Sequence, residues 1–112
     1  MKNIVVAISG DSMGKGSEDL GKILVKGFIR TLAEQDTAPS AIIFFNSGAH
    51  LTAKGSNALD DLKQLEEKGA EILTCGTCID YYELDKQPEA GSVTNMYEIS
   101  KRLLSADSVV NI

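Results

Sequence analysis

Residues 41–45, Ala-Ile-Ile-Phe-Phe, form an uninterrupted apolar run that ends at the polar residues Asn46 and Ser47. A short run of β-branched and aromatic residues without polar alternation is typical of a strand covered on both faces. Residues 3–8, Asn-Ile-Val-Val-Ala-Ile, and residues 71–74, Glu-Ile-Leu-Thr, read as two further strands of this kind. Strands buried on both faces occur in parallel sheets between layers of helices, so the three runs predict an α/β fold.

The segments between these runs carry the signals of helices. Ser17 supplies a capping hydroxyl, and the two acidic residues after it suit the positive end of a helix dipole. A second helix is expected to begin at Ser56 or Asn57 and to end at Gly69. The apolar residues expected to face the sheet are Leu20, Ile23, Leu24, Gly27, Phe28 and Leu32 in the first helix and Leu59, Leu62 and Leu65 in the second. Gly27 is expected to let the first helix approach the sheet closely.

The last third of the chain predicts one more helix and one more strand. Residues 81–91 are polar and irregular, and Asn95 with Glu98 then resembles a capping box. Met96, Ile99 and Leu103 form the apolar side of the helix that follows, and residues 108–112 read as a short final strand.

The order of the predicted elements is therefore β-α-β-α-β-loop-α-β. It predicts a three-layer α/β/α sandwich with a mainly parallel central sheet of four to five strands, in a single domain that spans residues 1–112. The residues expected to be buried include Val5, Val6, Ile42, Phe44, Ile72 and Val110.

The composition argues against several classes of partner. The chain has 112 residues, a formal net charge of −5, no Trp and no cluster of Lys or Arg, so nucleic acid is not an expected partner. The apolar runs are too short to span a bilayer, and we expect neither membrane insertion nor a signal peptide. The expected location is the cytoplasm, where paired cysteines are more often reactive than structural.

Both cysteines of the chain lie in one segment, Cys75-Gly76-Thr77-Cys78, directly after the third predicted strand. The carboxyl ends of strands in an open α/β sheet are where such folds bind ligands. A helix that begins near Cys78 would favour a thiolate through its dipole, whereas the nearby carboxylates of Asp80 and Glu83 would oppose it.

Three chemistries use a Cys-x-x-Cys pair. The alternative without any chemistry is that the two cysteines are small buried residues beside a turn. The pair can exchange disulfides, bind a metal ion, or carry sulfur as a persulfide. His50 is the only histidine, and two cysteines with one histidine do not complete a structural zinc site, so we expect no metal and no cofactor. His50 itself is expected to be solvated rather than a general base. Tyr81 and Tyr82 are expected to pack in the core rather than to wall a pocket.

The loops that follow the first and second strands are expected to meet the cysteines on one concave surface, because carboxyl ends of parallel strands lie at one edge of a sheet. The first loop has the glycines of a phosphate-binding loop but neither its spacing nor its Ser or Thr, so it does not predict nucleotide hydrolysis. The residues expected to line the pocket are Gly14, Lys15, Gly16, Asn46, Ser47, Gly48, Gly76, Thr77 and Asn95.

Four blocks of the sequence, taken together, resemble a known family. The blocks are residues 14–21 (Gly-Lys-Gly-Ser-Glu-Asp-Leu-Gly), 45–48 (Phe-Asn-Ser-Gly), 75–78 (Cys-Gly-Thr-Cys) and 93–97 (Val-Thr-Asn-Met-Tyr). In this order and at similar spacing they resemble the carboxyl-terminal, DsrE/DsrF-like domain of YedF-type selenium-metabolism proteins. The resemblance covers essentially the whole chain, with two departures. The amino-terminal sulfur-carrier domain of YedF-type proteins is missing here, since Met1 leads directly into the first strand, so the protein either works alone or is a piece of a longer one. Glu83 stands where the pattern usually has a glycine.

The resemblance implies both a fold and a function. It implies a DsrE/DsrF-like α/β/α fold, a homo-oligomer, and relay of sulfur or selenium as a cysteine persulfide. Cys75 matches the cysteine shared across the wider class, and Cys78 matches the extra cysteine of the YedF-type subset. The implied partners are sulfur or selenium donor and acceptor proteins, among them a carrier similar to TusA, the domain to which YedF-type proteins are fused.

The expected function is therefore that of a sulfurtransferase-like carrier. We expect Cys75 to react first, because Gly76 would let nearby amides point at its sulfur, and Cys78 to resolve the persulfide while shielded by Ile79 and Leu84. Two alternatives remain open: a non-catalytic binding or assembly module, and a thiol–disulfide oxidoreductase.

Overall fold

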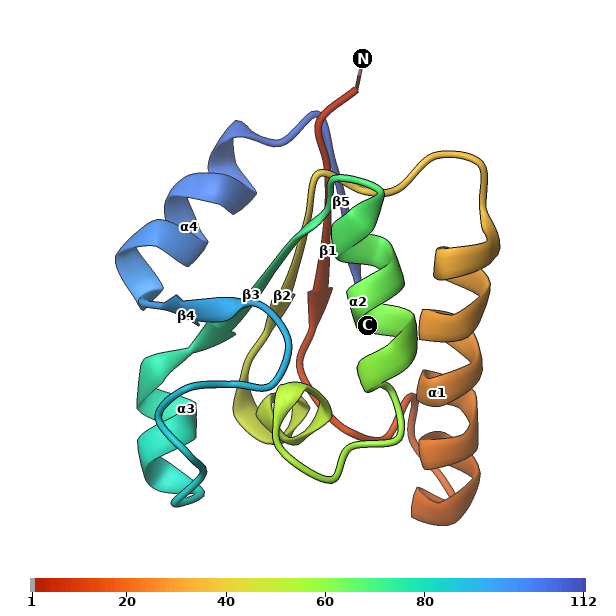
Figure 1. Cartoon of the computed structure of the whole chain (residues 1–112), viewed down its shortest axis with the longest axis vertical. Coiled ribbons are helices and arrows are strands. Elements are labelled where there is room, and N and C mark those ends of the chain that lie inside the picture. Colours follow the sequence, from red (N-terminus) through yellow and green to blue (C-terminus); the bar gives the residue numbers. More distant parts are fainter. Residues whose placement is uncertain (1) are drawn as a thin grey trace.

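A computed structural model describes residues 2–112 of the chain (Figure 1). Its five strands form one all-parallel sheet in the order β4-β3-β2-β1-β5, flanked by helices on both faces, which confirms the predicted α/β architecture. The elements are β1 (Ile4–Ile8), α1 (Glu18–Glu34), β2 (Ala41–Phe44), the 3₁₀ helix η1 (Asn46–Thr52), α2 (Leu59–Glu67), β3 (Glu71–Cys75), α3 (Gly76–Tyr81), β4 (Ser92–Thr94), α4 (Met96–Ser105) and β5 (Ser108–Asn111).

The central strands contribute to a separate core on each face of the sheet. Helices α1 and α2 cover one face and α4 covers the other (Figure 1). Val6, Ile42 and Phe44 pack in the core under α1 and α2, whereas Val5 and Ile43 pack in the core under α4. Because successive side chains of a strand point to opposite faces, a strand covered on both sides needs an apolar residue at every position, which explains the uninterrupted apolar runs.

Two expectations about the edges of the sheet are wrong. Val110, expected to be buried, is 40% exposed, because β5 is an edge strand that pairs only with β1. The edge strand β4 is absent from the predicted element order. It has only three residues, Ser92–Thr94, and lies in a segment without an apolar run. Its strand conformation therefore depends on the parallel pairing of its backbone with β3.

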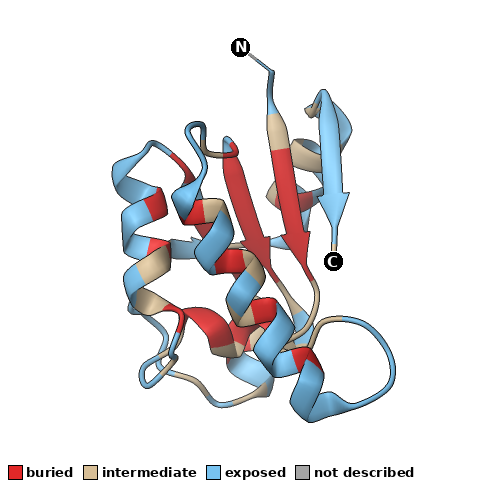
Figure 2. Cartoon of the chain, turned by 90° about the vertical axis from the view of Figure 1, so that its right-hand side faces the viewer, coloured by how far each residue is buried: buried red, intermediate tan, exposed pale blue. Residues whose placement is uncertain are grey.

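The buried face of α1 also differs from the predicted one. Leu20, Ile23 and Leu24 are exposed, Ile23 to 69%, while Phe28 and Leu32 are only partly buried. The buried positions are Gly21, Val25, Ile29 and Ala33. They are spaced four residues apart and lie on the side of the helix that faces the sheet (Figure 2). Both stripes satisfy helical spacing, so periodicity alone did not distinguish them.

The close approach of α1 to the rest of the fold occurs at Gly21, not at Gly27. A Cβ atom at Gly21 would lie 2.0 Å from Ser12 Oγ and 3.0 Å from backbone atoms of Met13, whereas nothing lies within 4 Å of one at Gly27. The loop after β1 folds over this position, since the amide of Met13 donates a hydrogen bond to the Gly21 carbonyl at 2.9 Å.

The starts of α1 and α4 and the end of α2 follow the sequence signals, whereas α2 begins at Leu59 and not at Ser56 or Asn57, and its N-cap Ala58 has no side chain that could cap it. Ser17 Oγ accepts a hydrogen bond from the amide of Leu20 at 3.2 Å, and Asn95 Oδ1 accepts one from the amide of Glu98 at 2.9 Å. Gly69 after α2 has φ = 101°, a conformation that glycine adopts without steric cost. Within residues 2–112, none of the helices combines the length and the apolar character needed to cross a membrane.

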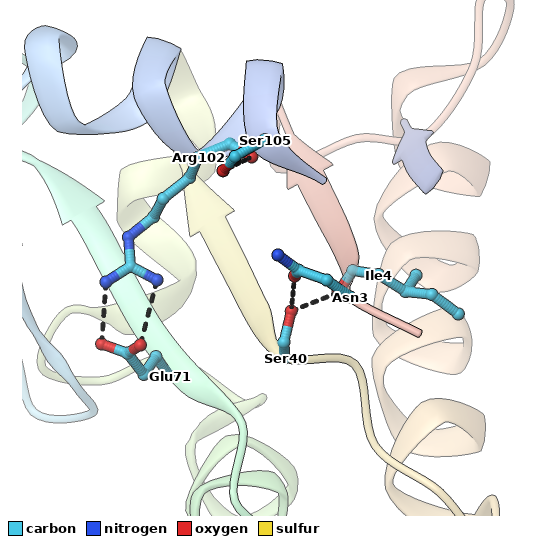
Figure 3. A network of polar contacts seen from close by, with 6 residues as sticks. All are labelled: Asn3, Ile4, Ser40, Glu71, Arg102 and Ser105. Atoms are coloured by element: carbon cyan, nitrogen blue, oxygen red, sulfur yellow. Dashed lines mark hydrogen bonds and ion pairs between the residues drawn. The ribbon is translucent and has the colours of Figure 1, made fainter. Parts of the chain in front are cut away.

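Polar contacts pin the end of the sheet where the strands begin (Figure 3). The guanidinium of Arg102 on α4 donates to both carboxylate oxygens of Glu71, at 3.0 and 3.1 Å, where β3 starts. Ser40 Oγ, just before β2, donates to the carbonyl of Ile4 at 2.9 Å and also bonds Asn3. These contacts hold together the end of the sheet at which the strands begin. The cysteines lie at the opposite end, beyond the reach of these contacts.

We predict that two identical substitutions in α1 have opposite effects on stability. Gly27→Ala should raise the free energy of unfolding by about 0.5–1 kcal/mol, because the site is open and alanine favours the helix. Gly21→Ala should lower it by about 1–3 kcal/mol, because the new methyl group meets Ser12 and Met13. Urea denaturation followed by far-UV circular dichroism measures both, and equal effects at the two positions would contradict the assigned face of α1.

Candidate active site around Cys78

The two cysteines occupy different environments at the end of β3. Cys75 is the last residue of the strand and the N-cap of α3, and its side chain belongs to the core under α4, with 1% exposure. Cys78 lies within α3, is partly exposed and lines a cavity. The expectation that Cys75 is the accessible sulfur and Cys78 the shielded one is therefore wrong. The strand continues through Cys75, so its side chain follows the alternation of β3 into the core.

The cavity beside Cys78 has a volume of about 440 Å³. Most of its lining residues belong to η1 and α3 or adjoin them. These two helices lie at the end of the sheet toward which the strands run (Figure 1). Its walls come from the residue that follows β2, from η1, from α3 and from the first residue of α4. The lining residues are Phe45, Asn46, Thr77, Cys78, Tyr81, Tyr82 and Met96.

Asn46, the first residue of η1, contacts the Cys78 sulfur directly. Its backbone amide donates a hydrogen bond to Cys78 Sγ at 3.0 Å, and its side-chain Oδ1 accepts one from the hydroxyl of Tyr82 at 2.9 Å. Asn46 has φ = 52°, in the left-handed region that asparagine tolerates better than most residues. The 3₁₀ helix that begins here is tied to β3 by a buried hydrogen bond between Thr52 and Thr74, whose hydroxyl oxygens lie 2.8 Å apart.

The pKa of the Cys78 thiol is raised above its ordinary value. The largest cause is burial, which disfavours the charged thiolate. The amide of Asn46 acts in the opposite direction, because a hydrogen bond to the sulfur favours the thiolate, while the neighbouring Cys75 raises the pKa further through a hydrogen bond and through charge repulsion. The carboxylates of Asp80 and Glu83, which the sequence suggested as a cause, are exposed and are not among the causes of this shift.

The structure brings some of the predicted pocket residues to the Cys78 cavity and places others behind it. Asn46 and Thr77 line the cavity. Ser47 points away, since its Oγ accepts a hydrogen bond from the amide of Asp11 at 3.2 Å. Gly48 is buried against β1, where a Cβ would lie 2.5 Å from the carbonyl oxygen of Ile8.

Two further predicted residues, Gly76 and Asn95, adjoin the cavity walls without lining it. A Cβ at Gly76 would lie 3.2 Å from a methyl group of Val93, so this glycine fits α3 against β4. Asn95 is exposed and caps α4, which places the lining residue Met96 directly after it.

The Gly14 loop does not reach the cysteines. Gly14, Lys15 and Gly16 are exposed and are not among the lining residues of the Cys78 cavity. The loop instead folds onto the start of α1, where Ser12 Oγ donates a hydrogen bond to the carbonyl of Glu18 at 3.0 Å. The predicted convergence therefore holds for the loop after β2 and the cysteines, and the loop after β1 stays outside it.

Sequence reasoning missed most of the cavity wall. Tyr81 and Tyr82, expected in the core, line the cavity, as does Met96, which is 59% exposed rather than buried on the inner side of α4. Phe45 was assigned to the strand but lies beyond its last residue, Phe44. One sequence signal could have indicated that Met96 lies near the cysteines: it directly follows Asn95, the cap of the first helix expected after the cysteine segment.

His50 does not face either sulfur. Its ring packs against the ring of Tyr82, with centroids 4.5 Å apart, and it lines a separate cleft of about 240 Å³ that also holds Asp11 and Lys22. Within residues 2–112, no three His, Cys, Asp or Glu side chains come together in a group that could hold a metal ion.

Glu83, which departs from the pattern of the resembling proteins, adopts a backbone conformation that suits a glycine. Its φ is 54°, and it follows α3 directly after Tyr82. A glycine would adopt this angle without steric cost. The chain keeps the turn with glutamate in its place.

Comparisons with known proteins agree with this fold. A family model described as the DsrE/DsrF-like family matches residues 5–112. The structure is similar to the YchN protein from E. coli, with a TM-score of 0.76 and 21% sequence identity over 100% of both chains. It is also similar to MTH1491 from Methanobacterium thermoautotrophicum, described as a protein of unknown function, with a TM-score of 0.69 and 15% identity over 97% of each chain. No curated protein sequence matches the chain.

At these identities the two solved structures establish the fold alone. Neither they nor the family match singles out the YedF-type proteins.

We predict that Cys75→Ala lowers the pKa of Cys78, because it removes the neighbouring thiol that helps to raise it. The rate of Cys78 alkylation by iodoacetamide should therefore reach half of its maximum at a lower pH in this variant than in the wild type. Peptide mass spectrometry assigns the labelled cysteine, and circular dichroism checks the fold. An unchanged or higher midpoint would show that Cys75 does not act on Cys78.

Proposed function

The chain belongs to the DsrE/DsrF-like family, whose members are generally sulfur-relay proteins, and we propose that it carries sulfur as a persulfide on Cys78. The observation that carries this proposal is the position of the Cys78 sulfur in the wall of an open cavity, 3.0 Å from a backbone amide. A nucleophilic cysteine has to be reachable by a donor and needs a group that stabilises its thiolate. Cys75 does not meet the first requirement, since its side chain is buried in the core.

Loading exchanges one sulfur–sulfur bond for another. The Cys78 thiolate attacks the outer sulfur of a donor persulfide, the bond between the two donor sulfurs breaks, and the donor leaves as a thiolate that takes up the proton lost by Cys78. The products are a Cys78 persulfide and a donor thiol, so no external oxidant or reductant is needed. In delivery, a thiolate of the acceptor attacks the outer sulfur and Cys78 leaves as the thiolate.

The cavity suits a bound persulfide because of the residues in its walls. Phe45, Tyr81, Tyr82 and Met96 present aromatic rings and a thioether, and sulfur makes favourable contacts with aromatic rings. A volume of about 440 Å³ leaves room for the outer sulfur and for the tip of a donor or acceptor segment.

Cys75 has a secondary role in this proposal. Attack of its sulfur on the inner sulfur of the Cys78 persulfide would expel hydrogen sulfide and leave a Cys75–Cys78 disulfide, which a dithiol reductant would then have to reduce. Burial of Cys75 keeps this side reaction slow and favours transfer to the acceptor. The proposal thus assigns first reactivity to Cys78, in contrast to the role that the resemblance implied for Cys75.

The alternative of a thiol–disulfide oxidoreductase has one observation in its favour, the proximity of the Cys75 thiol, which acts on the pKa of Cys78. Attack on a disulfide and attack on a persulfide both need the Cys78 thiolate, so the raised pKa of this thiol opposes both reactions and does not separate them. A non-catalytic binding module needs no thiol reactivity at all, so sulfur loading separates it from the carrier.

The proposed partners follow from the chemistry of the exchange and from the resemblance. The donor is a protein persulfide and the acceptor a protein thiol, such as that of a carrier similar to TusA, in the reducing environment of the cytosol. Sulfur is the proposed cargo, and the resemblance to YedF-type proteins is the reason to test a selenium donor beside it.

We also propose, following the resemblance, that the protein is a homo-oligomer. The exposed residues Leu20, Ile23 and Leu24 form an apolar patch on α1 that a second copy would cover. Light scattering at micromolar concentration should give a mass above that of one chain, and Ile23→Lys should lower it. A wild-type protein that stays monomeric would contradict this proposal.

We predict that incubation with a persulfide donor adds the mass of one sulfur atom to the wild type and to Cys75→Ser, but not to Cys78→Ser. Mass spectrometry of the intact protein, before and after treatment with a thiol reductant, measures the gain and its reversal. Loading of Cys78→Ser but not of Cys75→Ser would transfer the carrier role to Cys75. No loading of any form would leave the carrier function without support.

A further inference from the structure

Asn46 is held in an unfavourable backbone conformation at the point where β2 passes into η1. It is one of two residues other than glycine with a positive φ in residues 2–112, the other being Glu83. The left-handed region costs an L-residue about 1–2 kcal/mol, less for asparagine. A conformation of this kind persists where surrounding contacts hold it, and it is common at functional sites.

The conformation of Asn46 determines where its amide points. Two nearby backbone amides donate to backbone carbonyls: that of Phe45 to Ile8 at 3.1 Å, and that of Gly48 to Phe45 at 3.0 Å. The amide of Asn46 instead donates to the sulfur of Cys78, 32 positions away in the chain, at 3.0 Å. The turn at Asn46 therefore directs one backbone donor out of the fold and into the cavity.

Tyr82 holds the Asn46 side chain from the helix that carries Cys78. Its hydroxyl donates a hydrogen bond to Asn46 Oδ1 at 2.9 Å, and its own amide donates to the carbonyl of Cys78 at 3.1 Å. The ring packs against His50, with centroids 4.5 Å apart, and against the edge of Tyr81, at 5.1 Å. Cys78, Asn46 and Tyr82 thus form a closed set of contacts between α3 and η1.

We propose that Tyr82 is a positioning residue for Cys78: its hydroxyl holds the Asn46 side chain by a hydrogen bond and so keeps the Asn46 amide directed at the Cys78 sulfur. The reactive group is the sulfur, and Tyr82 acts on it only through Asn46. The consequence for sulfur relay rests on the proposed function, whereas the effect on the thiol does not.

The surroundings of Cys78 give this amide particular weight. The titratable groups around the sulfur are Cys75 of β3, Tyr81 of α3 and Tyr82 directly after it. His50 of η1 contacts the ring of Tyr82, and α4 contributes the uncharged Met96. Burial and Cys75 both oppose ionisation of the thiol, and the amide of Asn46 favours it. A loss of alignment at Asn46 would therefore remove the interaction that counters the other two.

The test is Tyr82→Phe, which keeps the ring and removes only the hydroxyl. The rate of Cys78 alkylation by iodoacetamide at pH 7 should fall by about threefold or more, as expected for a weakened hydrogen bond to a charged group, and the midpoint of the pH profile should move upward. Tyr97→Phe is the matched control: Tyr97 is exposed on α4, outside the Cys78 cavity, and its loss of a hydroxyl should leave rate and midpoint unchanged.

A second variant separates positioning from a general effect on the fold. Asn46→Gly removes the side-chain oxygen that accepts the hydrogen bond from Tyr82, and glycine tolerates the same backbone angle. Adding Tyr82→Phe to this variant should therefore cause no further change in the alkylation rate. An equal effect of Tyr82→Phe with and without Asn46→Gly would overturn the proposal, as would a pH profile of Tyr82→Phe identical to the wild type. Because alkylation needs no persulfide, a shifted profile in a protein that fails to load sulfur would support the positioning role while rejecting the carrier function.

Discussion

The parallel pairing of β2 with β3 is the constraint on which the site depends. Its register places Phe44 opposite Thr74, so the residues that follow the two strands emerge side by side at the same edge of the sheet. Asn46 and Cys78 meet there although neither is in a strand. A shift of this register by one residue would turn the apolar side chains of β3 to the other face and would separate the amide from the sulfur. The two cores and the cavity therefore share a single geometric requirement.

Opposing influences act on the sulfur that this pairing exposes. The cavity wall that would protect a persulfide from water also withdraws the thiol from water, and burial raises its pKa. A backbone amide compensates in part without bringing a charged side chain into the cavity. The ionisation of Cys78 therefore depends on the balance between burial and the neighbouring Cys75, which oppose it, and one backbone donor, which favours it.

The position of Cys75 links the site to the stability of the fold. Its side chain belongs to the same core as Val5, Ile43 and Ile99, and next to it Thr74 forms the buried hydrogen bond that ties η1 to β3. No buried side-chain nitrogen or oxygen atom in residues 2–112 lacks a hydrogen-bond partner. The end of β3 therefore consists of satisfied, closely packed residues, and the more accessible sulfur, that of Cys78, lies in the following helix α3.

The sequence by itself determined the α/β fold, the order of its major elements and the segment that holds the cysteines. These features depend on local signals, namely apolar runs without alternation, capping residues and glycines, which act within a few positions along the chain. Tertiary structure decided which stripe of α1 is buried, that β4 joins the sheet, and which cysteine faces the cavity. It also decided the contact of Asn46 with Cys78, 32 positions apart, and with Tyr82, 36 positions apart. Such contacts depend on the register of the strands and on how the helices cover the sheet, and no local pattern in the sequence encodes either.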